Sequence, residues 1–149
     1  MQNRQSSCVT EPDGGIPDAY EPWARSSPFL DLIGPLYSKV GPGDILWFGV
    51  RVDGRHVNRR GFAHGGLLAT LADMVLGYTV ARAAKDHPPF VTTSMSLDIA
   101  SPARLGDWLE GKAEVQKLGR TTGFANAYLL IGDRRVVRAS AVFVTPQRA

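Results

Sequence analysis

Asp73 is the residue of this chain with the clearest chemical potential. It is the one acid in a nearly unbroken apolar run from Leu67 to Ala84. A carboxylate is costly to bury unless it is paired or used in chemistry. In apolar surroundings it can act as a general base on water, or as a nucleophile that forms an acyl-enzyme anhydride. Pairing with a structural donor is the alternative, and the sequence leaves all three roles open.

Two glycines just before this run offer a second chemical function. The stretch NRRGFAHGG, residues 58–66, leads directly into it and ends in Gly65 and Gly66. The first amide N–H groups of a helix have no intrahelical partner, and glycine lets a ligand approach the backbone closely. A carbonyl at this helix end would be polarised by an N–H group and by the helix dipole. The simpler alternative is that the glycines only permit a tight turn.

The distance between the Gly65 N–H group and the Asp73 carboxylate limits how these two groups can act on one substrate. Eight positions separate Gly65 from Asp73, which is about 12 Å along a helix axis. One reacting carbon cannot contact both groups of the same helix. If they share a site, the acid must come from a second, antiparallel copy, which predicts a twofold dimer with two composite sites.

The pattern of the chain predicts the elements that position these residues. Leu67–Ala84 is apolar all round, which is typical of a buried helix that needs cover on every side. A sheet curled around it would cover part of its surface, and a partner subunit could cover the rest. The other expected elements are a short helix within Ser27–Gly34 and strands at 45–52, 91–99, 108–118, 121–131 and 136–144. We expect the last four strands to form an antiparallel meander, giving an α+β fold.

Composition predicts a small protein with one folded domain. The chain has 149 residues, of which 44% are hydrophobic and 21% charged, values that are ordinary for a globular domain. Residues 1–26 are rich in Gly, Pro, Ser and charge, so we expect a flexible or extended arm ahead of a single domain at 27–149.

Charge and cysteine content exclude several classes of partner. The net charge of +3 comes without a block of Lys and Arg, so we expect no nucleic-acid partner. Asp73 at the centre of the long helix argues against a membrane span. The single cysteine, Cys8, rules out an intrachain disulfide, and the polar N-terminus does not resemble a signal peptide. These features predict a cytoplasmic protein.

The arrangement of Asn58, His64, Gly65, Gly66 and Asp73 resembles that of the hotdog-fold acyl-CoA thioesterases, specifically the phenylacetate-degradation type of the hydroxybenzoyl-CoA thioesterase superfamily. In that family an Asn lies six positions before the His of a His-Gly-Gly, and an acid nine positions after that His. Both spacings are kept here. The resemblance extends over 29–145, including Ser-Pro-Ala at 101–103 and Gly-Arg at 119–120. It implies an antiparallel sheet wrapped around one long central helix.

The resemblance also implies roles for individual residues. Acyl-CoA hydrolysis would use the Gly65 N–H as the oxyanion contact and Asp73 of the partner subunit as base or nucleophile. A hydroxyl beside the acid would come from Thr92, Thr93 or Ser94, and alignment favours Thr92. A one-residue slip would turn that side chain to the other face of the strand.

The remaining polar residues near the glycines have less specific roles. Asn58 could orient water or the acid, or hold its loop by side-chain hydrogen bonds. We expect the His64 imidazole to fix the loop that carries Gly65. His56 and His87 look like loop residues, and no second ligand lies at metal spacing, so we expect no metal and no cofactor.

Cations near the mouth of the site would help to bind the phosphates of coenzyme A. The candidates for substrate binding are Arg59, Arg60 and Arg120, together with the backbone at Gly66. The sequence leaves open whether the assembly is a dimer or a dimer of dimers.

Two other functions remain possible on the same fold. A hydratase or dehydratase would use a catalytic His with an acid at another spacing, and the apolar run after Gly66 supplies only Asp73. A non-enzymatic acyl-CoA sensor would have no reason to keep a carboxylate against an apolar acyl group. We therefore expect a thioesterase.

Overall fold

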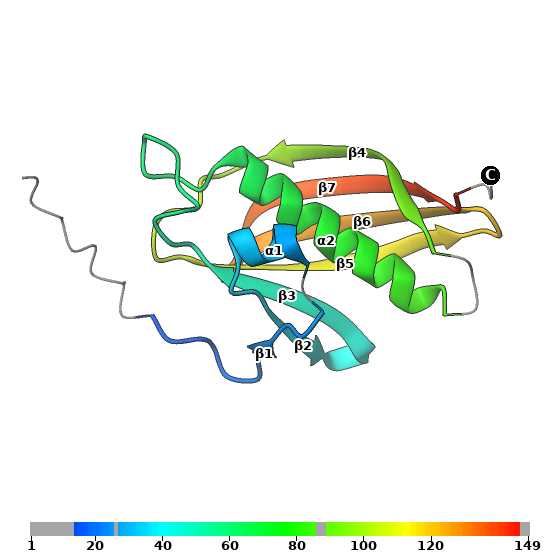
Figure 1. The fold of residues 1–149 in the computed structure, drawn as a ribbon, viewed down its shortest axis with the longest axis horizontal. Helices are drawn as coiled ribbons and strands as arrows, with labels where there is room; N and C mark the ends of the chain where they lie inside the picture. The colour runs from blue at the N-terminus through cyan, green and yellow to red at the C-terminus, as the bar shows by residue number, and fades with distance from the viewer. Residues whose placement is uncertain (1–13, 26, 86–88, 147–149) are drawn as a thin grey trace, which may run out of the picture.

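A computed structural model describes residues 14–25, 27–85 and 89–146. Its elements lie along one curled sheet that carries a long helix on its inner face (Figure 1). In chain order they are β1 (Glu21–Pro22), α1 (Pro28–Ile33), β2 (Tyr37–Gly41), a 3-10 turn (Pro42–Asp44), β3 (Ile45–Arg51), α2 (Gly65–Ala83), β4 (Val91–Ile99), β5 (Trp108–Leu118), β6 (Thr122–Ile131) and β7 (Arg134–Val144).

The sheet is antiparallel throughout, but its strand order differs from the predicted meander. The order is β1-β2-β3-β5-β6-β7-β4. Of the four strands predicted to form the meander, β5, β6 and β7 do so, whereas β4 follows α2 across the sheet and pairs with β7. The prediction of four successive neighbours was therefore wrong, because α2 separates β3 from β4 and lets the chain cross to the far edge.

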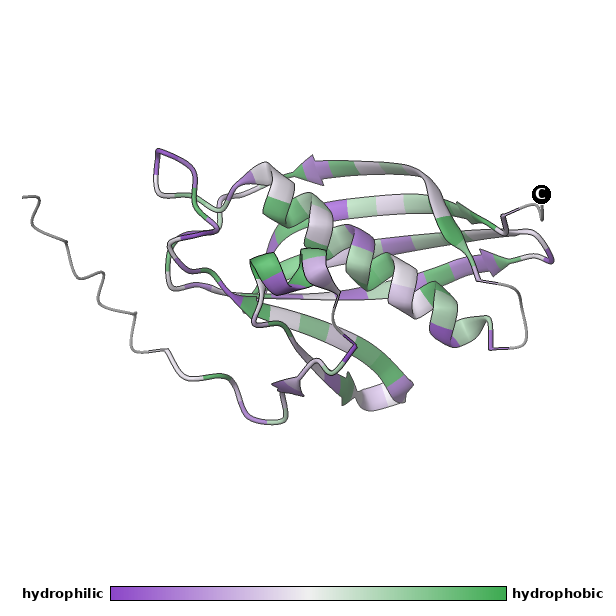
Figure 2. Ribbon diagram, in the orientation of Figure 1, coloured by the Kyte–Doolittle hydropathy of each residue, from purple (hydrophilic) through white to green (hydrophobic). Residues whose placement is uncertain are grey.

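The helix α2 supplies the centre of the hydrophobic core. Leu68, Leu71, Val75 and Leu76 are almost completely buried, and they pack against inward-facing residues of the sheet. Figure 2 shows α2 almost entirely in green and white, with isolated purple bands. The segment forms a helix because leucine and alanine favour it, and it begins at Gly65, so the two glycines lie at its start as expected.

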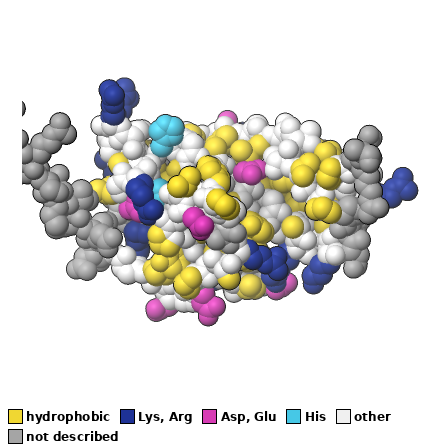
Figure 3. Space-filling model, in the orientation of Figure 1, with side chains coloured by type: hydrophobic (Ala, Val, Ile, Leu, Met, Phe, Trp, Pro, Cys, Tyr) yellow, Lys and Arg dark blue, Asp and Glu magenta, His cyan; other side chains and the backbone are white. Residues whose placement is uncertain are grey.

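The rest of the described chain leaves one face of α2 uncovered. Ala69, Thr70, Asp73 and Gly77 are only half-buried, and residues 81–83 are exposed. The expectation that Asp73 is buried was thus wrong for the single protomer, since the sheet covers only one side of the helix. On the face that carries α1 and α2, hydrophobic side chains are spread over the surface (Figure 3).

The described part of the predicted arm is extended and docks on the domain. Tyr20 is buried, and its hydroxyl donates to Glu110 Oε2 at 2.6 Å. Burial, followed by this hydrogen bond, raises the pKa of Tyr20 above its usual value. Trp23 packs edge-on against Phe48 with ring centroids 4.8 Å apart. Residues 1–13 and 26 of the predicted arm lie outside the described residues.

The short helix α1 is confirmed with the capping that its sequence predicts. Ser27 is the N-cap, and its Oγ accepts from the Leu30 N–H at 3.3 Å. A proline occupies the first helical turn and Gly34 ends the helix. Within the described residues, no helix is long and apolar enough to cross a membrane.

Candidate active site

The start of α2 leaves one backbone donor free. His64 is the N-cap, and its Nδ1 accepts from the Gly66 N–H at 2.9 Å. The imidazole therefore fixes this turn, as expected from the sequence. Among the described residues, no acceptor bonds to the Gly65 N–H. That group is the one donor at this helix end that remains for a ligand.

A hollow of about 360 Å³ opens beside this donor. The lining residues come from the loop before α2, from α2 and from the end of β4: Asn58, Phe62, Ala63, Gly65, Leu68, Ile99, Ala100, Ser101, Pro102 and Ala103. The Ala63 N–H donates to the Ala103 carbonyl at 2.8 Å. This bond holds the Ser-Pro-Ala segment next to Gly65, so two parts of the predicted site that lie far apart in sequence meet here.

Asn58 has a structural task in this loop. Its Oδ1 accepts from the Arg60 N–H at 2.9 Å and from the Phe62 N–H at 3.3 Å. Both hydrogen bonds stabilise the turn, so the side-chain NH2 group is the part of Asn58 that a ligand could use. Arg59 and Arg60 are exposed on the same turn.

Asp73 lies in a different place and has a specific partner. Thr92 Oγ1 donates to Asp73 Oδ1 at 2.7 Å. The register of β4 against β7 shifts between Thr92 and Ser94, so Thr93 is an extra residue in a β-bulge. The bulge decides which hydroxyl faces the helix, and it brings Thr92 to the acid.

Most of the residues that line the hollow around Asp73 and Thr92 have apolar side chains. Its volume is about 370 Å³, and its other lining residues are Met74, Gly77, Tyr78, Ala81, Phe90, Val91 and Phe143. It shares no lining residue with the hollow beside Gly65. Within the described chain, the free N–H and the acid therefore lie in two separate hollows along the same helix.

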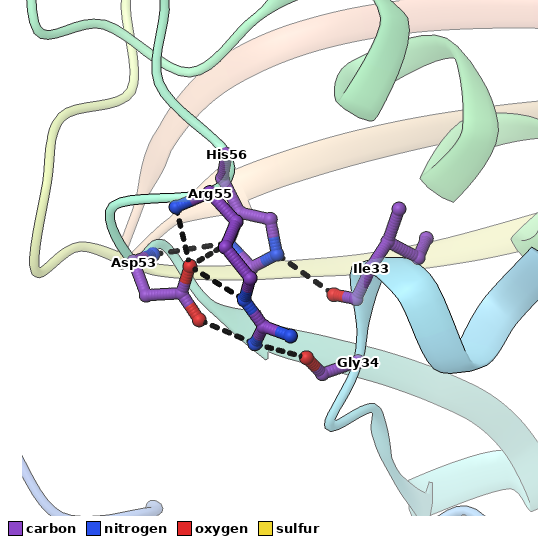
Figure 4. Close-up of polar contacts among 5 residues, drawn as sticks. All are labelled: Ile33, Gly34, Asp53, Arg55 and His56. Carbon is purple, nitrogen blue, oxygen red and sulfur yellow. Dashed lines mark hydrogen bonds and ion pairs between the residues drawn. The ribbon is translucent and has the colours of Figure 1, made fainter.

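A buried histidine that the sequence did not single out supports the loop before α2. His56 is 3% exposed. Its Nδ1 accepts from the Asp53 N–H at 3.0 Å, and its Nε2 contacts the Ile33 carbonyl at 2.7 Å, so Nε2 carries the proton (Figure 4). The His56 carbonyl accepts from the His64 N–H at 2.7 Å. His56 thus ties α1 to the residue that caps α2.

Asp53 and Arg55 complete this cluster. Arg55 donates to both Asp53 oxygens and to the Gly34 carbonyl (Figure 4). Partial burial opposes ionisation of Asp53, but hydrogen bonds from the Arg55 side chain and backbone outweigh it and lower the pKa of Asp53. His56 lies in a loop, as expected, but its role in the loop was not predicted, because its partner carbonyl is 23 residues away. His87 lies outside the described residues.

Arg120, the remaining predicted cation, is exposed in the turn between β5 and β6. This turn is at the opposite end of α2 from Arg59 and Arg60, and it lies close to the end of the sheet where β4 begins. Within the described residues, no group of three or more His, Cys, Asp or Glu side chains is placed to hold a metal ion.

This chain is similar in sequence to known proteins. Residues 60–138 match the family model described as Thioesterase superfamily. A protein of Pseudomonas aeruginosa named as an esterase is 45% identical over 131 residues, which are 88% of this chain and 98% of that protein. Human acyl-coenzyme A thioesterase 13 is 35% identical over 91 residues, 60% of this chain and 63% of that enzyme. The match thus spans less than two thirds of the length of the human enzyme.

Solved structures share the fold. A mutant of the phenylacetic acid degradation protein PaaI from Thermus thermophilus matches with a TM-score of 0.68 and 25% identity, covering 80% of this chain and 100% of that one. A thioesterase from Streptococcus pneumoniae, determined with coenzyme A, matches with a TM-score of 0.66 and 29% identity, covering 76% and 91%. These matches confirm the hotdog fold and the PaaI-like resemblance, and with the family model they establish that this chain belongs to the thioesterase superfamily.

Proposed function

We propose that this thioesterase hydrolyses acyl-CoA to a carboxylic acid and free coenzyme A in composite sites formed by two protomers. The observation that carries the proposal is the separation of the two half-sites. The free Gly65 N–H and the Asp73–Thr92 pair lie in different hollows, about 12 Å apart along one helix. Two antiparallel copies of α2 would bring the donor of one half-site to the acid of the other.

The geometry of α2 and β4 supports such a twofold pairing. If Gly65 of one copy faces Asp73 of the other, the twofold axis passes level with Ala69, midway between them. Ala69 is a small residue on the uncovered face of the helix, and small residues allow helices to approach closely. Thr92 contacts Asp73, and a Cβ at Gly65 would lie 3.6 Å from Ile99. These two contacts show that β4 runs alongside α2. A twofold axis that makes the two α2 helices antiparallel therefore also makes the two β4 strands antiparallel to each other.

The proposed chemistry follows from the two half-sites. The Gly65 N–H, at the positive end of the helix dipole, stabilises the negative charge that forms on the thioester oxygen. Asp73 takes a proton from water, whose oxygen adds to the carbonyl carbon, and the coenzyme A thiolate leaves and is then protonated. Alternatively, the carboxylate itself attacks and water hydrolyses the resulting anhydride. In either route the Thr92 hydroxyl orients the carboxylate.

Coenzyme A is proposed as the carrier because of the relatives and the surface charges. Human acyl-coenzyme A thioesterase 13 is a relative, and the similar Streptococcus pneumoniae structure was determined with coenzyme A. In the composite arrangement, Arg59 and Arg60 would come from one protomer and Arg120 from the other. Their charges would flank the site and favour the phosphates. Assembly into a dimer of dimers, a cytoplasmic location and the lack of a cofactor stay predictions.

Replacing Asp73 tests the proposed reaction. Wild type and Asp73→Asn are compared with acetyl-, octanoyl- and benzoyl-CoA, with release of free thiol as the readout. We expect wild type to release thiol and the variant to be about 10²–10⁴-fold slower, the usual contribution of a positioned base. Full activity of the variant would remove Asp73 from the mechanism. Binding without hydrolysis by wild type would favour the sensor.

A further inference from the structure

Gly77 lies in the middle of α2, where nothing in the protomer requires a glycine. A glycine destabilises a helix interior relative to alanine, so its presence needs a reason. Its backbone does not have a positive φ, and a Cβ at this position would meet only Phe143 Cε1, at an ordinary 3.8 Å. Gly111 provides the contrast, because a Cβ there would lie 2.4 Å from Leu129 Cδ2. Packing explains Gly111, but it does not explain Gly77.

The space in front of Gly77 belongs to the hollow that contains Asp73. Residue 77 is one turn beyond Asp73 on the same helix face, and both line that hollow. Its walls are the hydrophobic side chains of Met74, Phe90 and Phe143 and the ring of Tyr78. The Tyr78 hydroxyl is directed to the Arg25 carbonyl, at 3.4 Å. Beyond the Asp73–Thr92 pair, the hollow is therefore suited to an apolar group.

We propose that Gly77 determines which acyl groups this enzyme accepts, by leaving room for an apolar chain or ring next to Asp73. The inference rests on the proposed function, since the acyl group is attached to the carbonyl that Asp73 serves. From Asp73 past Gly77 to Ala81 the hollow follows the helix for about 12 Å, two turns. This length accommodates a medium-chain or single-ring acyl group in addition to the short ones.

A partner helix does not account for the glycine. With the twofold axis level with Ala69, residue 77 lies opposite residue 61 of the other copy. Because α2 begins at Gly65, the partner's helix has already ended at that level. The glycine is thus not needed for close helix contact, and the space next to the reacting carbonyl is left for the substrate.

Two substitutions at position 77 and one control test the proposal. Gly77→Ala and Gly77→Leu reduce the space in steps. Ala83→Leu enlarges an exposed residue of the same helix that does not line this hollow. Each variant and wild type are assayed for kcat/KM with acetyl-, octanoyl- and benzoyl-CoA, and for thermal midpoint and sedimentation. We expect Gly77→Leu to lower kcat/KM for the two larger substrates at least about tenfold relative to acetyl-CoA, as methylene-sized changes in an apolar pocket do.

Gly77→Ala should also lower kcat/KM for the two larger substrates relative to acetyl-CoA, but by a smaller factor. Its thermal midpoint should be equal to or above that of wild type. The control should keep the wild-type profile. An equal loss for all three substrates, a lower midpoint for Gly77→Ala, or dissociation into monomers would overturn the inference while leaving thioester hydrolysis intact. A wild-type protein that hydrolyses none of them would instead refute the proposed function, and this inference with it.

Discussion

The two edge strands of the sheet differ in length: β1 has two residues, and β4, at the opposite edge, has nine. β1 contains Pro22 and is flanked by Tyr20 and Trp23, which the protomer packs and largely buries. β4 is the outermost strand on its side, with most of its residues exposed and Asp98 as its one charge. Short strands and proline protect an edge, whereas a long uncharged strand invites pairing.

The same contrast holds for the polar groups near each edge. On the β1 side, the Tyr20 hydroxyl, Glu110 and the His56 imidazole bond to groups of the same chain. On the β4 side, Asp73 accepts a hydrogen bond from Thr92, but the Gly65 N–H has no acceptor among the described residues. The difference teaches that the groups on the β1 side stabilise the fold, whereas the β4 side carries the residues that we propose to meet a substrate and a second copy. Substitutions on the two sides should therefore have different consequences.

The largest effect in this comparison is expected from Gly65→Pro, which removes the free N–H. Proline is favoured at the first position of a helix, and the preceding His64 already has the extended backbone, φ −64 and ψ 140, that proline requires. The fold should thus be kept, while kcat falls about 10²–10³-fold, as for loss of one oxyanion donor. Gly65→Ala, which keeps the N–H, is the control. Equal activity of the proline variant and this control would argue against the oxyanion role.

Thr92→Val should have a smaller effect on the same side. It removes the hydroxyl that bonds to Asp73 and keeps the size of the side chain. The bond orients the carboxylate in the proposed reaction, so we expect kcat to fall about tenfold when it is lost. Because Thr92 is exposed, we expect little change in stability. The matched control is Thr93→Val in the bulge, measured in the same thiol-release assay. If Thr93→Val were the more damaging change, the assignment of the hydroxyl would be wrong.

On the β1 side, we expect His56→Ala to lower the free energy of unfolding. The change leaves the Asp53 N–H and the Ile33 carbonyl without their partner, at a cost of about 1–3 kcal/mol in the free energy of unfolding. His64→Ala removes only a helix cap and should cost about 1 kcal/mol, which His64→Asn should restore. Denaturant unfolding measures all three variants. A larger loss for His64 than for His56 would reverse the expected order.

The smallest effect concerns Asp53 and pH. Its pKa is lowered in the folded state, so its ionised form contributes stability above the ordinary pKa of 3.8 and loses it as pH falls below that value. Asp53→Asn should therefore flatten the fall in stability of the wild type between about pH 5 and pH 2. Thermal midpoints across this range measure the effect. A variant with the same acid dependence as wild type would show that Asp53 is not responsible.

Most of the elements could be predicted from the sequence, and so, through the family resemblance, could the contact between Thr92 and Asp73. The apolar run defines α2, and alternation defines β4, because both patterns are local. The strand order could not be predicted in the same way, because the pairing of β4 with β7 depends on where α2 sends the chain. β2 was missed because its five residues, YSKVG, show little alternation.

The site shows the same limit at finer scale. The spacing of Gly65 and Asp73 was enough to predict that the two residues lie apart on α2, since helix rise is constant, and they line different hollows. The exposure of Asp73 was misjudged because an all-apolar helix does not reveal which side the sheet covers. The contact of Thr92 with Asp73 depends on a β-bulge, and the burial of His56 depends on a carbonyl of α1. Neither feature leaves a local pattern in the sequence.

The measurement that most directly tests the central claim is complementation between two inactive variants. Asp73→Asn and Gly65→Pro subunits are co-expressed with different tags, and the mixed dimer is isolated through both tags. If each site takes Gly65 from one protomer and Asp73 from the other, the mixed dimer has one intact site and should show about half of the wild-type activity. If both groups act within one chain, every site is defective and the mixed dimer should be as inactive as either parent.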